Sequence, residues 1–258
     1  MAEKELRRDR PAPGVLRLTL DRPHVHNAMP IALQRALDTA LSDAAHEDSV
    51  RVVILAGAGG RAFCAGYDLE ELEAMPPEVA QSSMAAREDM LWRYLIYPKP
   101  TVAAVDGIAY GAGTMYAACS DLCVGGPATT MAVSAAKYGG ANLTWLLDTL
   151  IGAARARDLL LTARAVPGEE AYRMGLLTRY EPDVGEAALQ VAKDIAAQPP
   201  EGIRQIKQLL LDGPGRSLRA RYEHENSVVY STLEQQSITD MFSTFFATRP
   251  PSTTTGEV

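Results

Sequence analysis

The chain has 258 residues, 47% of them hydrophobic and 22% charged, a balance typical of a globular protein with a sizeable buried core. Its formal net charge of −7 argues against general nucleic-acid binding, because a basic surface supplies most of the affinity in that class of protein. The three cysteines and four histidines show no metal-ligand spacing, so no metal site is predicted, and so few thiols indicate a reducing compartment.

The first half of the chain alternates predicted strands and helices. Short apolar or alternating runs indicate strands, and apolar residues spaced three and four apart indicate helices. The predicted strands cover residues 15–20, 50–55 and 101–105, and the predicted helices cover 30–45 and 69–96, the second broken at Pro76 and Pro77. This order is typical of a parallel sheet with crossover helices, so the predicted fold class is α/β.

Beyond about residue 144 the strand signal fades and helical patterns dominate. We therefore predict an α/β core over residues 1–195, a helical region over 196–250 and a disordered polar tail over 251–258. The charged N-terminus lacks the apolar centre of a secretory signal, and no apolar run reaches the roughly 20 residues that cross a bilayer. These features predict a cytoplasmic protein with no membrane partner.

The predicted C-terminal helix has a wide aromatic face. Ile238, Met241, Phe242 and Phe245 repeat at helical spacing, and Phe246 lies beside them. This face either packs on the chain's own core or meets a neighbouring subunit or a lipid-like ligand. Both interpretations stay open at this point.

Two glycine-rich segments follow predicted strands. The first is RAFCAGYDL at residues 61–69, and the second runs from Lys99 to Gly113 and enters a helical pattern at 114–120. Small residues let a backbone approach a ligand closely, and a helix N-terminus presents free N–H groups. Two such donors that converge on one point form an oxyanion hole, which stabilises a carbonyl oxygen as it gains negative charge. The alternative is a pair of tight loops in an α/β fold.

Three segments together resemble the signatures of the crotonase (enoyl-CoA hydratase/isomerase) superfamily, in order and at familiar spacing. They are DRPHVHNAM (21–29), RAFCAGYDLEEL (61–72) and KPTVAAVDGIAYGAGTMYAACSDL (99–122), and AYRMGLLTRY (171–180) is similar to a later family segment. The resemblance spans roughly residues 13–250. It implies a crotonase-like spiral of ββα units, an acyl-CoA thioester of fatty acid metabolism as the ligand, and a homotrimer or hexamer. In that arrangement the C-terminal helical region would take part in assembly and cover the acyl pocket.

The resemblance also implies roles for individual residues. The oxyanion donors would be the backbone N–H groups of Tyr67 and Ala112, the second of which is normally a glycine in the family. The CoA contacts would come from His24, Val25, His26, Ala65, Asp68 and Leu69. The alternative for the two histidines is an exposed turn. For Asp68, an N-cap of the following helix is favoured over catalysis.

Family hydratases carry two glutamates that this chain lacks. The first would stand at the position of Met115, and the second would fall within MAVSAAKY, residues 131–138, which has no carboxylate. Between Asp121 and Asp148 the sequence contains no Asp, Glu or His. Hydration of a conjugated thioester needs an acid and a base, commonly a pair of carboxylates. Ordinary hydration of crotonyl-CoA is therefore predicted to be absent or weak.

Substitutes for the acid–base pair are few. Lys137 lies in the segment that lacks its glutamate, and Asp148 lies near a position where some family members keep an aspartate. A buried lysine can titrate near neutrality, but a surface position is the favoured interpretation for both residues. Two hypotheses follow. One is an enzyme of the enoyl-CoA hydratase/isomerase type that stabilises a thioester enolate, with coenzyme A as part of the substrate and no tightly bound cofactor. The other is a catalytically inactive acyl-CoA-binding homologue.

Overall fold

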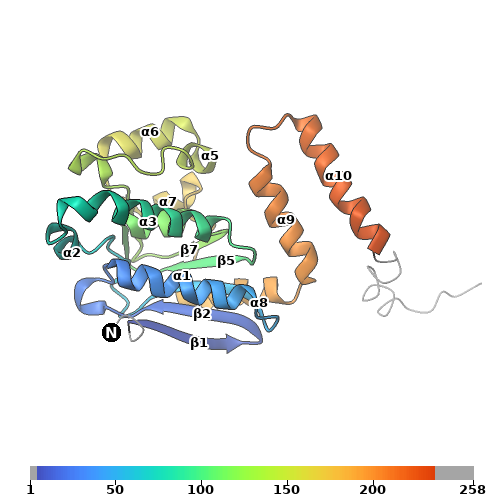
Figure 1. Ribbon diagram of the computed structural model, residues 1–258, viewed down its shortest axis with the longest axis horizontal. Helices are drawn as coiled ribbons and strands as arrows, with labels where there is room; N and C mark the ends of the chain where they lie inside the picture. The colour runs from blue at the N-terminus through green and yellow to red at the C-terminus, as the bar shows by residue number, and fades with distance from the viewer. Residues whose placement is uncertain (1–4, 236–258) are drawn as a thin grey trace, which may run out of the picture. The chain divides into compact units, whose positions relative to one another are not determined.

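The computed structural model describes residues 5–235 (Figure 1). The strands are β1 (Leu6–Ala12), β2 (Gly14–Leu20), β3 (Val50–Gly57), β4 (Ala62–Cys64), β5 (Thr101–Val105), β6 (Ile108–Tyr110), β7 (Leu122–Gly125), β8 (Thr130–Ala132), β9 (Val166–Pro167) and β10 (Arg179–Tyr180). The α-helices are α1 (Ile31–Ala45), α2 (Leu69–Glu73), α3 (Pro77–Leu95), α4 (Ala112–Ala118), α5 (Leu147–Ile151), α6 (Ala153–Thr162), α7 (Gly168–Met174), α8 (Val184–Ala196), α9 (Pro200–Asp212) and α10 (Leu218–Gln235). Two 3-10 helices are η2 (Pro23–Val25) and η3 (Ala135–Tyr138).

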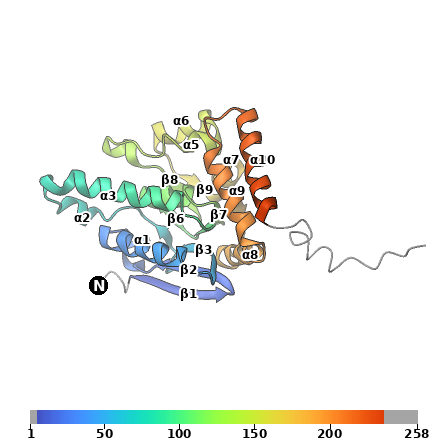
Figure 2. The same cartoon turned by 45° about the vertical axis from the view of Figure 1, so that its right-hand side comes forward.

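The strands form two sheets. The larger has the order β1-β2-β3-β5-β7-β10, with β1 antiparallel to β2 and the remaining neighbours parallel. The smaller has the order β4-β6-β8-β9, in which the first three strands are parallel and β9 is antiparallel. In Figure 2 the strands β6, β8 and β9 lie together, separate from β1, β2 and β3.

A repeated ββα unit connects the two sheets. β3, β5 and β7 lie in the larger sheet, and each is followed directly by a short strand of the smaller sheet, β4, β6 or β8. A helix follows each pair: α2 after β4, α4 after β6, and α5 after β8 and η3. The structure therefore confirms the predicted α/β class and its ββα units.

Both faces of the larger sheet are buried at its central strand β3. Successive residues of a strand point to opposite faces, so Val53 and Leu55 of β3 enter the core that contains residues of α1 and α4. Val52 and Ile54 enter a second core, which contains the apolar residues of α8. A strand covered on both sides has no polar face, which explains the nearly continuous apolar run at residues 50–55.

The chain divides into two compact units. The first ends at Lys207, beyond the predicted core boundary at residue 195. Its last residue is anchored, because the Lys207 ammonium donates to Asp121 Oδ2 at 2.7 Å and to the Lys99 carbonyl at 3.1 Å. The second unit begins at Gln208; its described part consists of the end of α9 and of α10.

Two further predictions concern the C-terminal residues and the ability of the helices to span a membrane. Phe242, Phe245 and Phe246 and the tail at 251–258 lie outside the described residues. Among residues 5–235, every helix is too short or too polar to span a bilayer.

Candidate functional site

The loop after β4, residues 65–68, carries the first predicted donor, and we call it the donor loop. The Met29 N–H donates to the Gly66 carbonyl at 2.8 Å, and the Asp68 N–H donates to the Met29 carbonyl at 3.2 Å. These two bonds form a parallel bridge between Met29 and Tyr67. In a parallel bridge the residue between the two bonded groups turns its own N–H to the other side. The N–H of Tyr67 therefore points away from Met29.

The second predicted donor begins helix α4. Ala112 is its first residue, and amides in the first turn of a helix have no intrahelical acceptor. Gly111, which precedes it, has φ 51°, a left-handed conformation that favours glycine. The predicted helical pattern starts at residue 114, whereas α4 starts at Ala112. The Ala112 N–H therefore lies at the N-terminus of the helix, where it has no intrahelical acceptor.

The two donor segments are in direct contact. Gly66 has φ 112°, and a Cβ built on it would lie 3.0 Å from the Tyr110 carbonyl oxygen and 3.6 Å from the Ala112 nitrogen. Behind them, a Cβ on Gly113 would lie 2.1 Å from the Cys64 carbonyl oxygen, so α4 approaches the end of β4 backbone to backbone. The structure thus brings the amides of positions 67 and 112 into one small region, which an oxyanion hole requires.

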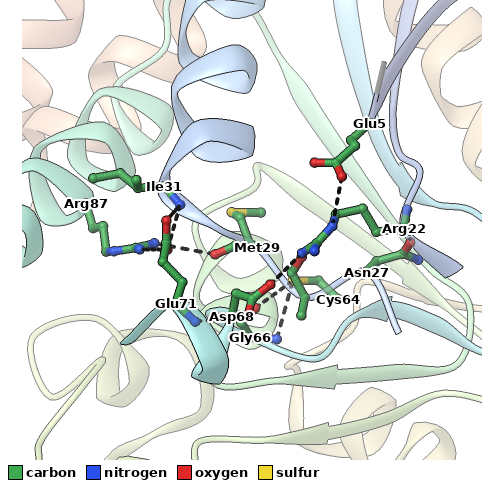
Figure 3. Close-up of polar contacts among 11 residues, drawn as sticks. Glu5, Arg22, Asn27, Met29, Ile31, Cys64, Gly66, Asp68, Glu71 and Arg87 are labelled. Carbon is green, nitrogen blue, oxygen red and sulfur yellow. Dashed lines mark hydrogen bonds and ion pairs between the residues drawn. The ribbon is translucent and has the colours of Figure 1, made fainter. Parts of the chain in front are cut away.

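Arg22 holds the outer side of the donor loop (Figure 3), and its backbone N–H donates to Asn27 Oδ1 at 2.9 Å. The Arg22 guanidinium donates to Asp68 Oδ2 at 2.7 Å and to the Ala28 carbonyl at 2.8 Å. Asp68 also accepts the Glu71 N–H, which makes it the N-cap of α2, as favoured from the sequence. The hydrogen bond from Arg22 is the main cause of the lowered pKa of the Asp68 carboxyl, although burial opposes it. Asp68 is therefore an ionised structural group.

The predicted CoA contacts lie on two adjacent loops. His24, Val25 and His26 are exposed in and just after η2, and the Ala65 N–H donates to the His26 carbonyl at 3.0 Å. Leu69 is 65% exposed at the start of α2. The structure therefore brings the histidine turn and the donor loop together. Within residues 5–235, the exposed side chains of His24, Val25, His26 and Leu69 make no hydrogen bond or ion pair.

The ring of Tyr67 turns inward, toward α3. The Arg87 guanidinium carbon lies 4.7 Å from the centre of this ring, and Arg87 is 0% exposed. Burial raises the pKa of the Tyr67 phenol, and the charge of Arg87 offsets part of the rise. The hydroxyl is therefore protonated at neutral pH and can donate but not accept a proton.

Position 115, where the family glutamate would stand, is buried on α4. Met115 is 7% exposed and belongs to the main hydrophobic core, and its neighbour Tyr116 accepts a hydrogen bond from Gln34 Nε2 at 3.0 Å. A thioether cannot exchange a proton. At position 115 of α4 the chain therefore has an apolar group where proton transfer would need a carboxylate.

Lys137 and Asp148 lie on separate elements. Lys137 is exposed in η3, and Asp148 is exposed on α5. Within residues 5–235 neither side chain makes a hydrogen bond or ion pair, and no contact joins either to Tyr67 or Ala112. Their location agrees with the surface interpretation, and their part in proton transfer stays a prediction.

Metal or thiol chemistry would need a cluster of ligands in the described part of the chain or a reactive Cys64, the cysteine nearest the donor loop. Residues 5–235 contain no cluster of three His, Cys, Asp or Glu side chains that could hold a metal ion. Cys64, next to the donor loop, is buried, and burial raises the pKa of its thiol to about 12. A thiol at that pKa is protonated at neutral pH and is a poor nucleophile.

Four buried or half-buried polar residues around the donor loop were not identified from the sequence. Asn27 is fully buried and donates to the carbonyls of Ala58 and Ala62. Gln34, Glu71 and Arg87 form a polar cluster on its inner side. For Gln34 a signal exists, since it lies beside Leu33 and Leu37 on the apolar face of the predicted helix. Glu71 and Arg87 resemble ordinary surface charges of helices.

Known proteins share both the sequence pattern and the fold. The family model for enoyl-CoA hydratase/isomerase matches residues 11–255. The 1,2-epoxyphenylacetyl-CoA isomerase of Escherichia coli K12 is 29% identical over 250 residues, covering 93% of this chain and 95% of that protein. The crystal structure of enoyl-CoA hydratase from Bacillus anthracis gives a TM-score of 0.90 at 28% identity, over 95% of this chain and 97% of that chain. The enoyl-CoA hydratase of Mycobacterium smegmatis gives 0.87 at 30% identity, over 96% and 98%.

Proposed function

The chain belongs to the enoyl-CoA hydratase/isomerase family, and on this premise we propose that it binds an acyl-CoA thioester and polarises the thioester carbonyl between the N–H groups of Tyr67 and Ala112. Where a base removes the α-proton of the thioester, or a nucleophile adds at Cβ, negative charge develops on that oxygen, and the two donors stabilise the resulting enolate. Coenzyme A is then part of the substrate, and the exposed turn of His24 to His26 with Ala65 and Leu69 forms its binding surface.

One observation carries this proposal: the contact between the donor loop and the start of α4. The Gly66 and Gly111 backbones approach so closely that a Cβ on Gly66 would lie 3.7 Å from the Gly111 Cα. The bridge with Met29 turns one N–H away from its neighbour strand, and the helix start leaves the other without an acceptor. Two fixed donors of this kind stabilise developing charge without reorganising during the reaction.

A chromophoric thioester tests the donor pair directly. In 4-(dimethylamino)cinnamoyl-CoA, polarisation of the thioester carbonyl moves the absorption band to longer wavelength. We expect saturable binding with a red shift, and competition by other acyl-CoA thioesters. Absence of binding, or binding without a red shift, would contradict the proposal.

A matched pair of proline variants tests the Ala112 donor. Ala112→Pro deletes the N–H at the first position of α4, where proline is otherwise tolerated. Ala153→Pro makes the same change at the first position of α6, which also follows a glycine of positive φ. We expect the first variant to lose the red shift and the second to keep it. In an active enzyme the loss of one donor lowers turnover by about 10²–10³-fold.

The second candidate function is an acyl-CoA-binding protein without turnover, and the buried Met115 favours it. A panel of enoyl-, dienoyl- and 3-oxoacyl-CoA thioesters separates the two, because an enzyme converts at least one of them and a binding protein only competes for the site. Crotonyl-CoA hydration is expected to be absent or very slow, since a general acid or base contributes about 10²–10⁴-fold. The double variant Met115→Glu with Ala135→Glu should gain weak hydration if only the acid–base pair is missing.

We also propose that the protein assembles as a homotrimer or hexamer, as the family resemblance implies, and that it acts in the cytoplasm, as its few thiols indicate. Light scattering at micromolar concentration tests the assembly. A mass close to the 27.8 kDa of one chain would refute it.

A further inference from the structure

A fully buried arginine lies behind the donor loop. Arg87 of α3 is 0% exposed, although arginines are almost never fully buried unless they are paired. Its Nη2 donates to the Glu71 carboxylate, and its Nη1 lies 3.4 Å from the Met29 carbonyl oxygen and 3.4 Å from Gln34 Oε1. Figure 3 shows Arg87, Glu71 and Met29 on one side of the loop, with Ile31 beside them.

Arg87 is linked to Tyr67 by one direct contact and one indirect contact. Its guanidinium carbon lies 4.7 Å from the centre of the Tyr67 ring, within the range of a cation–π contact. It also reaches the carbonyl oxygen of Met29, the same oxygen that accepts the Asp68 N–H at 3.2 Å. Ring and backbone of Tyr67 are thereby fixed to one rigid group.

Glu71 completes the cluster from the other direction. Its carboxylate oxygens accept the Ile31 N–H at 2.9 and 3.1 Å, which supplies a negative group at the start of α1. The same carboxylate pairs with Arg87. The donor loop, α1, α2 and α3 therefore meet at a single ion pair.

Stability alone is a weak reason for this arrangement. Burying a guanidinium carries a desolvation penalty, and buried ion pairs can often be replaced by apolar residues with no loss of stability. Among the described residues Arg87 Nε also has no hydrogen-bond partner. A guanidinium is planar and its N–H donors have fixed directions, so it fixes the orientation of the ring that stacks on it and of the acceptors that it binds. A lysine or an apolar residue does not fix their orientation in this way.

We propose that Arg87 is a positioning residue: through the Tyr67 ring and the Met29 carbonyl, it sets the direction of the Tyr67 N–H donor. This inference rests on the proposed function. It adds a specific role for a residue far from the donor loop in sequence.

The experiment compares substitutions of two arginines on the same helix. Arg87→Lys and Arg87→Met remove the stacked, forked contact, whereas Arg93→Lys makes the same kind of change at an arginine that pairs with Asp38 at 2.8 Å. The readouts are the dissociation constant and the red shift of bound 4-(dimethylamino)cinnamoyl-CoA, with the unfolding midpoint as a separate measure. We expect both Arg87 variants to lose at least half of the red shift, and their dissociation constants to rise by less than about tenfold, since most CoA contacts lie elsewhere. Arg93→Lys should keep the full shift.

A double-mutant cycle shows whether Arg87 acts through Tyr67. Tyr67→Leu keeps the backbone N–H and removes the ring. If Arg87 works through the ring, Arg87→Met should cause a smaller additional loss of red shift in the Tyr67→Leu background than alone. Should Arg87→Met fail to fold, Arg87→Lys and Glu71→Gln, which keeps an acceptor for Ile31, carry the same comparison.

The outcomes separate the two proposals. A wild-type protein that does not bind the chromophore, or binds it without a red shift, contradicts the proposed function. A wild-type red shift that persists undiminished in folded Arg87 variants overturns the role of Arg87 and leaves the donor pair standing. A lowered unfolding midpoint with an unchanged red shift would assign Arg87 to stability only.

Discussion

The donor loop and the segment from Ala135 to Asp148 differ sharply in how the fold holds them. The donor loop is bridged to Met29, its Asp68 caps α2 and pairs with Arg22, and its Tyr67 ring contacts Arg87. In the second segment Lys137 and Tyr138 are exposed, Tyr138 by 75%, and Asp148 is exposed as well. The loop that carries the proposed Tyr67 donor is thus fixed by buried contacts. In the segment where the resemblance places a proton-transfer group, Leu143 and Leu147 are buried, but the candidates Lys137 and Asp148 are solvent-exposed.

The largest expected effect comes from the close approach of α4 to β4. Gly113→Ala places a Cβ within 2.1 Å of the Cys64 carbonyl oxygen, so helix or strand must move. We expect a loss of about 3 kcal/mol in the free energy of unfolding, measured in urea, together with loss of the red shift. The control is Gly202→Ala on α9, where a Cβ meets nothing within 4 Å and the change should be neutral or stabilising. Equal unfolding energies for the two variants would contradict the close approach.

Two asparagines allow a direct comparison: Asn27 lies near the donor loop, and Asn142 lies in the segment from Ala135 to Asp148. Asn27 is fully buried, accepts the Arg22 N–H at 2.9 Å and donates to the carbonyls of Ala58 and Ala62. Asn27→Ala should lower the free energy of unfolding by about 2 kcal/mol, because buried carbonyls lose their donors. Asn142→Ala removes an amide that has no hydrogen bond among the described residues. It should change the unfolding energy by less than about 0.5 kcal/mol. Similar losses in both variants would remove the distinction between the regions.

Acid should loosen the donor loop through Asp68. Its pKa is lowered in the folded protein by the hydrogen bond from Arg22, so its contribution is fully present above the ordinary aspartate pKa. That contribution is lost as the pH falls through the lower folded-state pKa. Urea unfolding of the wild type and of Asp68→Asn should therefore differ at pH 7 and converge toward pH 3. A constant difference would show that the charge of Asp68 does not stabilise the loop.

The smallest expected effects concern the exposed candidates. Lys137→Met and Asp148→Asn should each change the unfolding energy by less than about 0.5 kcal/mol, because both groups are exposed and make no hydrogen bond or ion pair within residues 5–235. Turnover of any accepted thioester decides their chemistry. A drop of about 10²–10⁴-fold in one variant would identify it as an acid or base, and would make the second segment part of the active site.

The sequence predicts the long elements well and the short ones poorly. The strands at 15–20, 50–55 and 101–105 and the helix at 30–45 appear as β2, β3, β5 and α1, because each carries a long apolar pattern. The strands β4, β6 and β8 have three residues each, too few to show a period. They form where the neighbouring backbone pairs with them, which is a tertiary effect.

The site shows the same division. The glycine pattern and the resemblance predict where the two proposed N–H donors lie, because each follows a glycine, Gly66 or Gly111, whose positive φ favours glycine. The sequence does not identify Arg87 and Glu71 as residues near the site, because charged residues of helices usually face solvent. Only the folded chain shows that they meet behind Tyr67.

A site built from main-chain amides changes in a particular way over generations. Every amino acid except proline supplies an N–H at positions 67 and 112, so few mutations remove either group. An acidic side chain, by contrast, disappears with a single substitution. A lineage can therefore exchange its proton-transfer groups while each intermediate still holds and polarises its ligand, which leaves natural selection a working pocket on which new reactions arise.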